Sequence, residues 1–193
     1  MRITGGTGRG LKLTSPKTGS KSIRPTSDRV REALFSILAA KVVDAAVLDL
    51  YAGTGSLGIE ALSRGARQAV FVDQSRQSLT LIHDNLCRCF DAPQASLLQL
   101  NLSRSDCLQR LTKKLPPQFL FDLVFLDPPY KKNLAESSLQ MLEKTGLVKN
   151  MGLIIVEEHQ GESLPRQLAT LTLIDQRRYG ETGIWIYQET GSE

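Results

Sequence analysis

Residues 47–58 read Val-Leu-Asp-Leu-Tyr-Ala-Gly-Thr-Gly-Ser-Leu-Gly, an apolar run followed by a glycine-rich stretch. The apolar part predicts a buried strand, and the segment that starts near Ser56 predicts a helix. Gly53 and Gly55 can adopt a positive φ and allow a ligand to approach the backbone closely. The first turn of the helix offers free N–H groups and a positive dipole end to an anion. The stretch therefore predicts a ligand-binding strand–loop–helix unit.

Similar segments alternate along most of the chain. Strands are expected at about 46–51, 68–73, 96–101, 121–126 and 153–157, and helices at about 56–64, 75–89, 106–114 and 133–145. Another helix is expected after an N-cap at Thr26 or Ser27. The last part alternates like a hairpin, with strands at 169–174 and 184–187 around a turn at 180–183. This order predicts a Rossmann-like α/β fold with a mostly parallel seven-stranded sheet and an antiparallel C-terminal hairpin.

Acidic residues stand at the ends of two of these strands. Asp73 comes 20 residues after Gly53, where a doubly wound fold places the acid that binds ribose hydroxyls. The loop also matches Gly-x-Gly-x-x-Gly, so a nicotinamide-dependent oxidoreductase is one alternative. Asp49, however, would repel a pyrophosphate and could instead meet the ammonium of a methionine moiety. This acid favours S-adenosylmethionine as the cofactor.

A second motif, Asp-Pro-Pro-Tyr at 127–130, directly follows the apolar run 121–126. Proline fixes φ and has no N–H, so this loop should be rigid and should present hydrogen-bond acceptors. Asp127 and the Pro128 carbonyl can accept both N–H bonds of an exocyclic amine, and Tyr130 offers a flat face for stacking. The alternative is a strand that ends in an acid and a proline-rich turn. The whole motif predicts a site for the amino group of a nucleobase.

Positive charge is concentrated near the N-terminus. Residues 1–31 hold eight basic residues and one acidic residue, a net charge of +7, whereas the whole chain carries +4 and the remainder therefore −3. This asymmetry predicts a basic arm at 1–25, rich in glycine and serine and shaped as a short hairpin, that binds a polyanion. A solvated basic tail is the alternative. Lys131 and Lys132 add charge beside Tyr130.

With these motifs in view, the chain resembles the bacterial 16S ribosomal RNA guanine-N2 methyltransferases of the RsmD type. The resemblance covers nearly the whole chain and includes residues 2–6, 9–13, 24–35, 49–65 and 127–130. The glycine loop and the Asp-Pro-Pro-Tyr motif mark the wider class of amino methyltransferases. The segment 24–35, Arg-Pro-Thr-Ser-Asp-Arg-Val-Arg-Glu-Ala-Leu-Phe, is much more specific.

The resemblance implies methyl transfer from S-adenosylmethionine to a guanine N2 amine in 16S ribosomal RNA, at guanine-966 in this family. The substrate is expected to be 16S RNA or an assembly intermediate of the 30S subunit. Two alternatives are an amino methyltransferase that acts on another RNA or DNA base, and an RNA-binding module without catalysis. Intact Asp49, Asp73 and Asp127 argue against the second.

Three groups of site residues are expected. The catalytic group is Asp127, Pro128, Pro129 and Tyr130. The cofactor-binding group is Asp49, Tyr51, Ala52, Gly53, Thr54, Gly55, Asp73, Gln74, Asp106 and Cys107. The RNA-binding group is Arg2, Arg9, Lys12, Arg24, Arg29, Arg31, Lys131 and Lys132. For adenine, the stretch 101–106 offers two candidates, the Asn101 region and Asp106 with the Cys107 N–H. Members of the family that the chain resembles often carry Asn-Ala where this chain has Asp106 and Cys107. Asp106 could also be a helix N-cap.

Bulk properties limit the remaining classes. The chain has 193 residues, 41% of them hydrophobic, which suits one globular domain at 26–193 behind the arm. No apolar run approaches the ~20 residues of a membrane span, so we expect a cytoplasmic protein, and a monomer. The odd number of cysteines and the absence of CxxC spacing indicate reduced thiols and no metal site.

Overall fold

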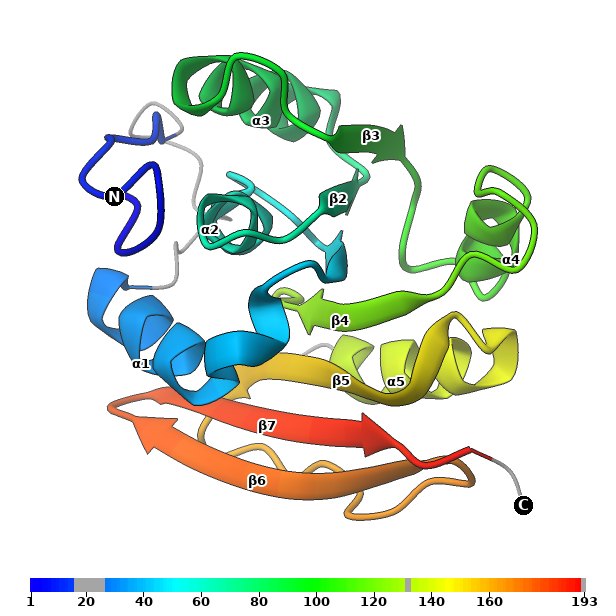
Figure 1. Ribbon diagram of the computed structural model, residues 1–193. Helices are drawn as coiled ribbons and strands as arrows, with labels where there is room; N and C mark the ends of the chain where they lie inside the picture. The colour runs from blue at the N-terminus through cyan, green and yellow to red at the C-terminus, as the bar shows by residue number, and fades with distance from the viewer. Residues whose placement is uncertain (16–26, 131–132, 192–193) are drawn as a thin grey trace. The chain divides into compact units, whose positions relative to one another are not determined.

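The computed structural model describes residues 1–15, 27–130 and 133–191. Helices and strands alternate along the chain, as Figure 1 shows. In chain order the elements are α1 (Asp28–Leu38), η1 (Ala39–Val42), β1 (Ala46–Leu50), α2 (Ser56–Ser63), β2 (Gln68–Asp73), α3 (Arg76–Cys89), β3 (Ala95–Gln99), α4 (Cys107–Thr112), β4 (Phe121–Leu126), α5 (Leu134–Thr145), β5 (Val148–His159), β6 (Leu171–Tyr179) and β7 (Thr182–Glu189). They form two compact units, Met1–Gln99 and Leu100–Glu193.

The first unit is built on three parallel strands in the order β3-β2-β1. Every residue of β1 is buried, because helices cover a parallel strand on both faces. Helix α2 packs against β1 and β2, and α3 packs against β2 and β3 (Figure 1). Ser27 caps α1 by accepting the Val30 N–H at 3.2 Å. Because β1 and β2 pair in parallel, their carboxyl ends lie next to each other, and these ends carry the acids Asp49 and Asp73.

The second unit is a mixed four-stranded arrangement in the order β4-β5-β7-β6. Strand β4 pairs with β5 in parallel, whereas β7 pairs antiparallel with both β5 and β6. Helix α5 packs against β5. Buried Ile184, Trp185, Ile186 and Tyr187 make β7 the core strand of the C-terminal hairpin. The carboxyl end of β4 leads directly into the Asp-Pro-Pro-Tyr segment.

The fold class predicted from the sequence is confirmed: seven strands form a mostly parallel α/β sheet with antiparallel C-terminal strands. Strand β5 is longer than expected and begins at Val148 instead of Leu153. The 3-10 helix η1 was not expected. At the N-terminus, Arg2 and Lys12 form an antiparallel bridge, and the Ile3 N–H donates to the Leu11 carbonyl at 3.0 Å. The division at residue 25 stays a prediction, since it falls outside the described residues.

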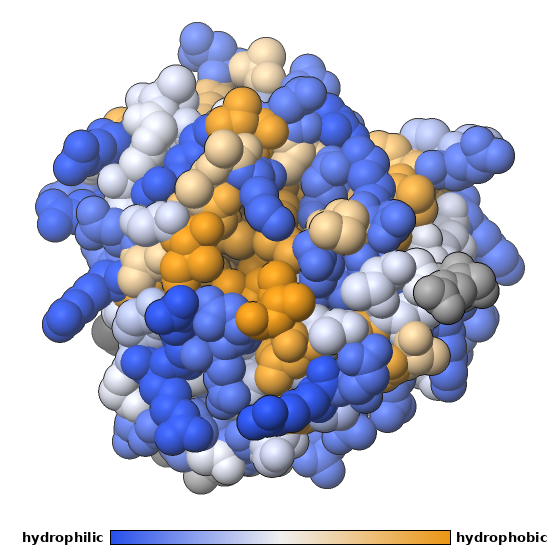
Figure 2. All heavy atoms as spheres, turned by 60° about the horizontal axis from the view of Figure 1, so that its bottom comes forward, coloured by the Kyte–Doolittle hydropathy of each residue, from blue (hydrophilic) through white to orange (hydrophobic). Residues whose placement is uncertain are grey.

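Most of the visible surface is polar. Figure 2 shows one face of the molecule, where hydrophilic residues surround a region of apolar ones. Among the described residues, the large apolar side chains that are exposed are Leu11, Ile37, Val43, Leu120, Met151 and Ile174. No helix within the described ranges is both long and apolar enough to cross a membrane.

Candidate functional site

The loop between β1 and α2 has an unusual backbone. Tyr51, Gly53 and Gly55 all have positive φ, at 60°, 54° and 75°. This conformation suits glycine and costs energy for a side chain such as that of Tyr51. The Ala52 N–H donates to the Val72 carbonyl at 3.1 Å, which fastens the loop to the end of β2. Gly55 occupies the N-cap position of α2, and its lack of a side chain leaves the first turn of that helix without a side-chain cap.

Asp73 supports this loop from the neighbouring strand. Its Oδ2 accepts the Gly53 N–H at 2.9 Å, and its Oδ1 accepts the Ser75 N–H at 2.7 Å. Asp73 is partly exposed and Gln74, next to it, is exposed. Each carboxylate oxygen can accept more than one hydrogen bond, so Asp73 can hold the loop and still accept from hydroxyl groups. A ribose contact at Asp73 stays a prediction.

Asp49 lies beneath the same loop and is 2% exposed. Its Oδ2 accepts the Gly58 N–H at 2.9 Å. Burial raises the pKa of Asp49 to about 8, and the charge of Asp73 acts in the same direction, while the Gly58 N–H opposes them. The carboxyl group is therefore largely protonated at neutral pH. A cation placed beside it would favour the ionised form.

The Asp-Pro-Pro-Tyr segment is held by groups from two strands of its own unit. Asp127 is partly exposed, Pro128 is buried and Pro129 is exposed. The Tyr130 hydroxyl donates to Glu157 Oε1 at 3.1 Å, and the Tyr130 hydroxyl oxygen lies 3.4 Å from Thr182 Oγ1. Burial, followed by the charge of Glu157, raises the pKa of Tyr130 well above its usual range. The phenol thus stays neutral, and its ring is fixed at the hydroxyl edge.

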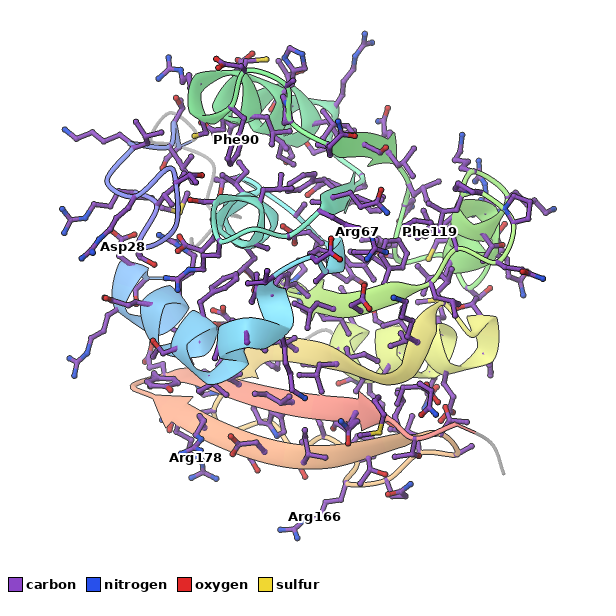
Figure 3. All side chains as sticks on the ribbon, viewed as in Figure 1. Asp28, Arg67, Phe90, Phe119, Arg166 and Arg178 are labelled. Carbon is purple, nitrogen blue, oxygen red and sulfur yellow. The ribbon has the colours of Figure 1, made fainter. Side chains whose placement is uncertain are left out.

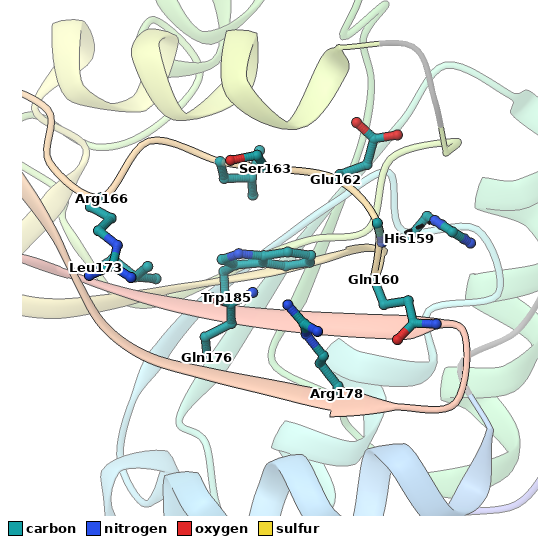
Figure 4. A pocket seen from close by; sticks show the side chains of 11 residues that line it. His159, Gln160, Glu162, Ser163, Arg166, Leu173, Gln176, Arg178 and Trp185 are labelled. Carbon is teal, nitrogen blue, oxygen red and sulfur yellow. Dashed lines mark hydrogen bonds between the residues drawn. The ribbon is translucent and has the colours of Figure 1, made fainter.

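A groove with a volume of about 590 Å³ lies in the second unit, next to the end of β5. Its residues come from the stretch 159–166 and from β6 and β7, and they include His159, Arg166, Arg178 and Trp185. Figure 4 shows the Trp185 indole between Ser163 and Arg178. Arg166 and Arg178 point away from the ribbon in Figure 3, and neither has an ion-pair partner among the described residues. The His159 ring lies 6.3 Å from that of Tyr130, edge to face, so the groove adjoins the Asp-Pro-Pro-Tyr segment.

The pair expected at adenine stands at the start of α4. The Asp106 carboxylate accepts two bonds from the Arg104 guanidinium, at 3.0 and 3.3 Å, and this pairing lowers the pKa of Asp106. Asp106 occupies the N-cap position, but its side chain makes no capping bond. The Cys107 N–H donates to the Arg104 carbonyl at 3.1 Å. A contact between adenine and this N–H stays a prediction, and it would require the turn to open.

The expected RNA-binding residues differ in exposure. Arg2, Arg9, Lys12 and Arg29 are exposed. Arg24, Lys131 and Lys132 lie outside the described residues. The assignment of Arg31 is wrong, because its side chain is 0% exposed and pairs with Glu60 at 3.3 Å and with Asp28 at 2.8 Å. Asp28 itself lies at the start of α1, beside the N-terminal segment (Figure 3). Arg31 therefore belongs to the interior of the first unit.

Three residues of the site were missed from the sequence. Glu157 and Thr182 hold Tyr130, and Asn85 on α3 bonds to the glycine loop through the Thr54 carbonyl at 3.2 Å. A signal existed for two of them: Glu157 ends an apolar strand, and Asn85 stands on the same helix face as Ile82 and Leu86. Nothing in the pattern distinguished Thr182 from an ordinary turn residue.

Comparisons with known proteins agree with this geometry. Residues 1–188 match the family model described as Conserved hypothetical protein 95. The chain belongs to this family. A relative named ribosomal RNA small subunit methyltransferase D from Escherichia coli strain K12 is 37% identical over 188 residues, covering 97% of this chain and 89% of that one. The relative of the same name from Haemophilus influenzae is 36% identical, covering 97% and 93%.

Solved structures with a similar fold include methyltransferases. An Escherichia coli protein, provisionally assigned as a methyltransferase, superposes with a TM-score of 0.80 at 34% identity, covering 100% of this chain and 99% of that one. A Thermus thermophilus protein gives 0.78 at 28% identity, covering 96% and 98%. The resemblance to the RsmD-type family, first inferred from sequence motifs, is thereby confirmed.

Proposed function

We propose that this protein uses S-adenosylmethionine to methylate the exocyclic N2 amine of a guanine in 16S ribosomal RNA. The names of its relatives support an RNA methyltransferase of the small ribosomal subunit. The position, guanine-966, and the state of the substrate, free 16S RNA or a 30S assembly intermediate, follow from the family resemblance. The observation that carries the amine specificity is the rigid Asp-Pro-Pro-Tyr segment at the carboxyl end of β4.

The first unit has the chemistry that S-adenosylmethionine requires. A buried acid of raised pKa, Asp49, suits the methionine ammonium, and the partly exposed carboxylate of Asp73 suits two ribose hydroxyls. Between them, Tyr51, Gly53 and Gly55 bend the backbone so that it can run close to the ligand. When bound, the cofactor supplies an electrophilic methyl group on a sulfonium.

The second unit has what the amine requires. Guanine N2 is a poor nucleophile, because its lone pair is delocalised into the ring. Asp127 and the Pro128 carbonyl would accept its N–H bonds, orient the nitrogen and increase its electron density. Asp127 or water would take the proton that the methylated nitrogen releases. Tyr130, fixed by Glu157, would stack on the base and contribute ~1–3 kcal/mol.

An unpaired guanine fits this site better than a paired one. A base pair would occupy the same amine that Asp127 and Pro128 are proposed to bind. The base must therefore lie in a loop or leave its stack before it reacts. RNA presents such bases in loops and bulges, which agrees with a ribosomal substrate.

The decisive experiment is methyl transfer to 16S RNA, followed by mass spectrometry of the nucleosides. N2-methylguanosine is the expected product, and it should be absent from 16S RNA of a strain that lacks this protein. The Asp127→Ala variant should lose about 10²-fold or more in single-turnover rate, the effect of removing one positioned polar group. Its affinity for S-adenosylhomocysteine should remain that of the wild type.

Controls separate this function from its competitors. A thermal shift with S-adenosylhomocysteine and none with NADH is expected, because a ligand that binds the folded state stabilises it. A different methylated nucleoside would overturn the N2 assignment but keep the enzyme class. Normal single-turnover transfer by Asp127→Ala would remove Asp127 from catalysis.

A further inference from the structure

The N-terminal segment, residues 1–14, is fastened to the helix that follows the glycine loop. The Thr4 N–H and hydroxyl donate to the two carboxylate oxygens of Glu60 at 2.8 and 2.7 Å. Ser63 accepts the Gly8 N–H at 2.9 Å and donates to the Gly5 carbonyl at 2.7 Å. Glu60 is 0% exposed and Ser63 is 1% exposed. The N-terminal segment is therefore hydrogen-bonded to two side chains of α2 that are shielded from water.

A second attachment reaches the glycine loop itself. Asn85, on α3, is 0% exposed. Its Oδ1 accepts the Thr14 N–H at 2.8 Å, and its Nδ2 donates to the Thr14 and Thr54 carbonyls, each at 3.2 Å. This orientation of the amide is the one that its partners require, since one is a donor and two are acceptors. One side chain thus joins the end of the basic segment to the residue between Gly53 and Gly55.

Through these hydrogen bonds, Asn85 connects the position of Thr14 to the position of Thr54 in the glycine loop. The Asn85 side chain and its bond to Thr54 are buried, whereas its two bonds to Thr14 are partly buried. Breaking the buried bond leaves a polar group without water as a substitute. A displacement of Thr14 must either break its bonds to Asn85 or turn the amide, and turning the amide changes its bond to Thr54. The reverse holds for a displacement of Thr54.

We propose that Asn85 couples RNA binding at residues 1–14 to cofactor binding at the glycine loop. In this role Asn85 is a positioning residue, because its bonds go to Thr14 and Thr54, which lie in the segment and in the loop. The inference rests on the proposed function, since it takes RNA as the ligand of the basic segment. Linkage makes such coupling reciprocal: each ligand changes the affinity of the other by the same factor.

The test is a binding cycle with S-adenosylhomocysteine and a 16S RNA fragment that the wild type methylates. The affinity for each ligand is measured with and without the other. For the wild type we expect each ligand to increase the affinity for the other by the same factor, of about 5 or more, which is the lower end of typical coupling. In Asn85→Leu, which removes all three bonds, the factor should fall below about 2.

Two further comparisons guard against a merely structural effect. Thr14→Pro removes the Thr14 N–H, keeps the carbonyl and fixes φ at this position. It should weaken the coupling as Asn85→Leu does, whereas Thr14→Ala keeps both backbone bonds and should retain it. Ser63→Ala loosens the segment from α2 without touching Asn85, so its coupling factor should equal that of the wild type. Thr14 is exposed, so the Thr14→Pro variant still tests the coupling if Asn85→Leu does not fold.

The outcomes distinguish this inference from the proposed function. If the wild type methylates RNA and the factor is 1, the coupling is overturned and the function stands. Equal factors in the wild type, Thr14→Pro and Asn85→Leu would also overturn it. If no RNA binds or reacts, the proposed function and the coupling fail together.

Discussion

Asp49 is the residue whose chemistry departs furthest from its ordinary state. Its pKa, raised by burial to about 8, keeps the carboxyl largely protonated at pH 7. A ligand ammonium beside it would lower that pKa and expel the proton. We therefore expect cofactor binding to release protons between pH 6 and 8. Calorimetry in buffers of different ionisation enthalpy measures the number of protons released on binding. The control is Asp49→Asn, which has no proton to release at this position.

The same residue makes stability depend on pH. An acid whose pKa is 3.8 when unfolded and about 8 when folded binds its proton more tightly in the folded state. Its contribution is complete below pH 3.8 and is lost as the pH rises through 8. The free energy of unfolding should thus fall less steeply between pH 4 and 8 in Asp49→Asn than in the wild type. Denaturant titrations of both proteins across this range would show parallel curves if Asp49 titrated normally.

Tyr130 allows the ring and the hydroxyl to be separated. Tyr130→Phe keeps the stacking face and loses the bond to Glu157, whereas Tyr130→Ala loses both. RNA affinity should fall by ~1–3 kcal/mol in the alanine variant and by less than about 1 kcal/mol in the phenylalanine variant. Equal losses in the two variants would show that the hydroxyl, and not stacking, is what matters.

At the scale of elements, the local sequence pattern predicts the bounds of several strands, but it does not reveal contacts between residues that are distant in the sequence. Strands β2 and β4 were predicted with the observed bounds, because apolar runs and their flanking turns define them. The first five residues of β5, Val-Lys-Asn-Met-Gly, do not form an apolar run, and they join the sheet where Val148 pairs with Phe121, before an irregularity in the register. Arg31 looks like any exposed arginine of a helix, and its burial depends on Glu60, which lies 29 residues away.

The candidate site follows the same rule. Its motifs at 49–58 and 127–130 are contiguous and can be read directly from the sequence. The groups that fix them come from elsewhere: Glu157 is 27 residues from Tyr130, and Asn85 is 31 residues from Thr54. Such supporting residues belong to ordinary strands and helices, and only tertiary structure makes them neighbours.

Helix α2 depends on a glycine in its interior. Replacing an interior glycine with alanine normally stabilises a helix by about 1 kcal/mol. At Gly58, however, a Cβ would lie 2.3 Å from the ring of Phe71, which is 0% exposed, and 3.1 Å from Asp49 Oδ2. Overpacking costs ~1–3 kcal/mol, so it should outweigh the helical gain.

Gly58→Ala should therefore lower the free energy of unfolding by up to about 2 kcal/mol. The Phe71→Leu background, which leaves room at this position, should reduce that loss in a double-mutant cycle. A gain in stability from Gly58→Ala alone would mean that the Phe71 ring moves aside freely.

At the scale of the whole molecule, the uneven charge predicts how RNA binding responds to salt. Arg2, Arg9 and Lys12 are exposed on the N-terminal segment, which is part of the stretch 1–31 with its net charge of +7. Replacing all three with Gln should weaken RNA binding and flatten its log–log salt dependence by about 0.7–0.9 for each RNA phosphate that the variant no longer neutralises. Arg110, Lys113 and Lys114, exposed in the second unit, provide a matched triple replacement of equal charge.

Affinities of the wild type and both triple variants at several salt concentrations decide the matter. The N-terminal variant alone should change slope. If both variants change alike, net charge and not the segment governs binding, and a segment without influence would give the wild-type line.

Trp185 gives the protein a built-in optical probe. It is the single tryptophan of the chain, it is 1% exposed, and its indole lies against Gly183, where a Cβ would come within 2.4 Å of the ring. Its emission therefore reports the environment of the C-terminal hairpin. Far-ultraviolet circular dichroism, in contrast, sums over the helices and strands of both units. Melting curves recorded by the two methods coincide only if the units unfold together, so one sample and two spectrometers measure how cooperative this chain is.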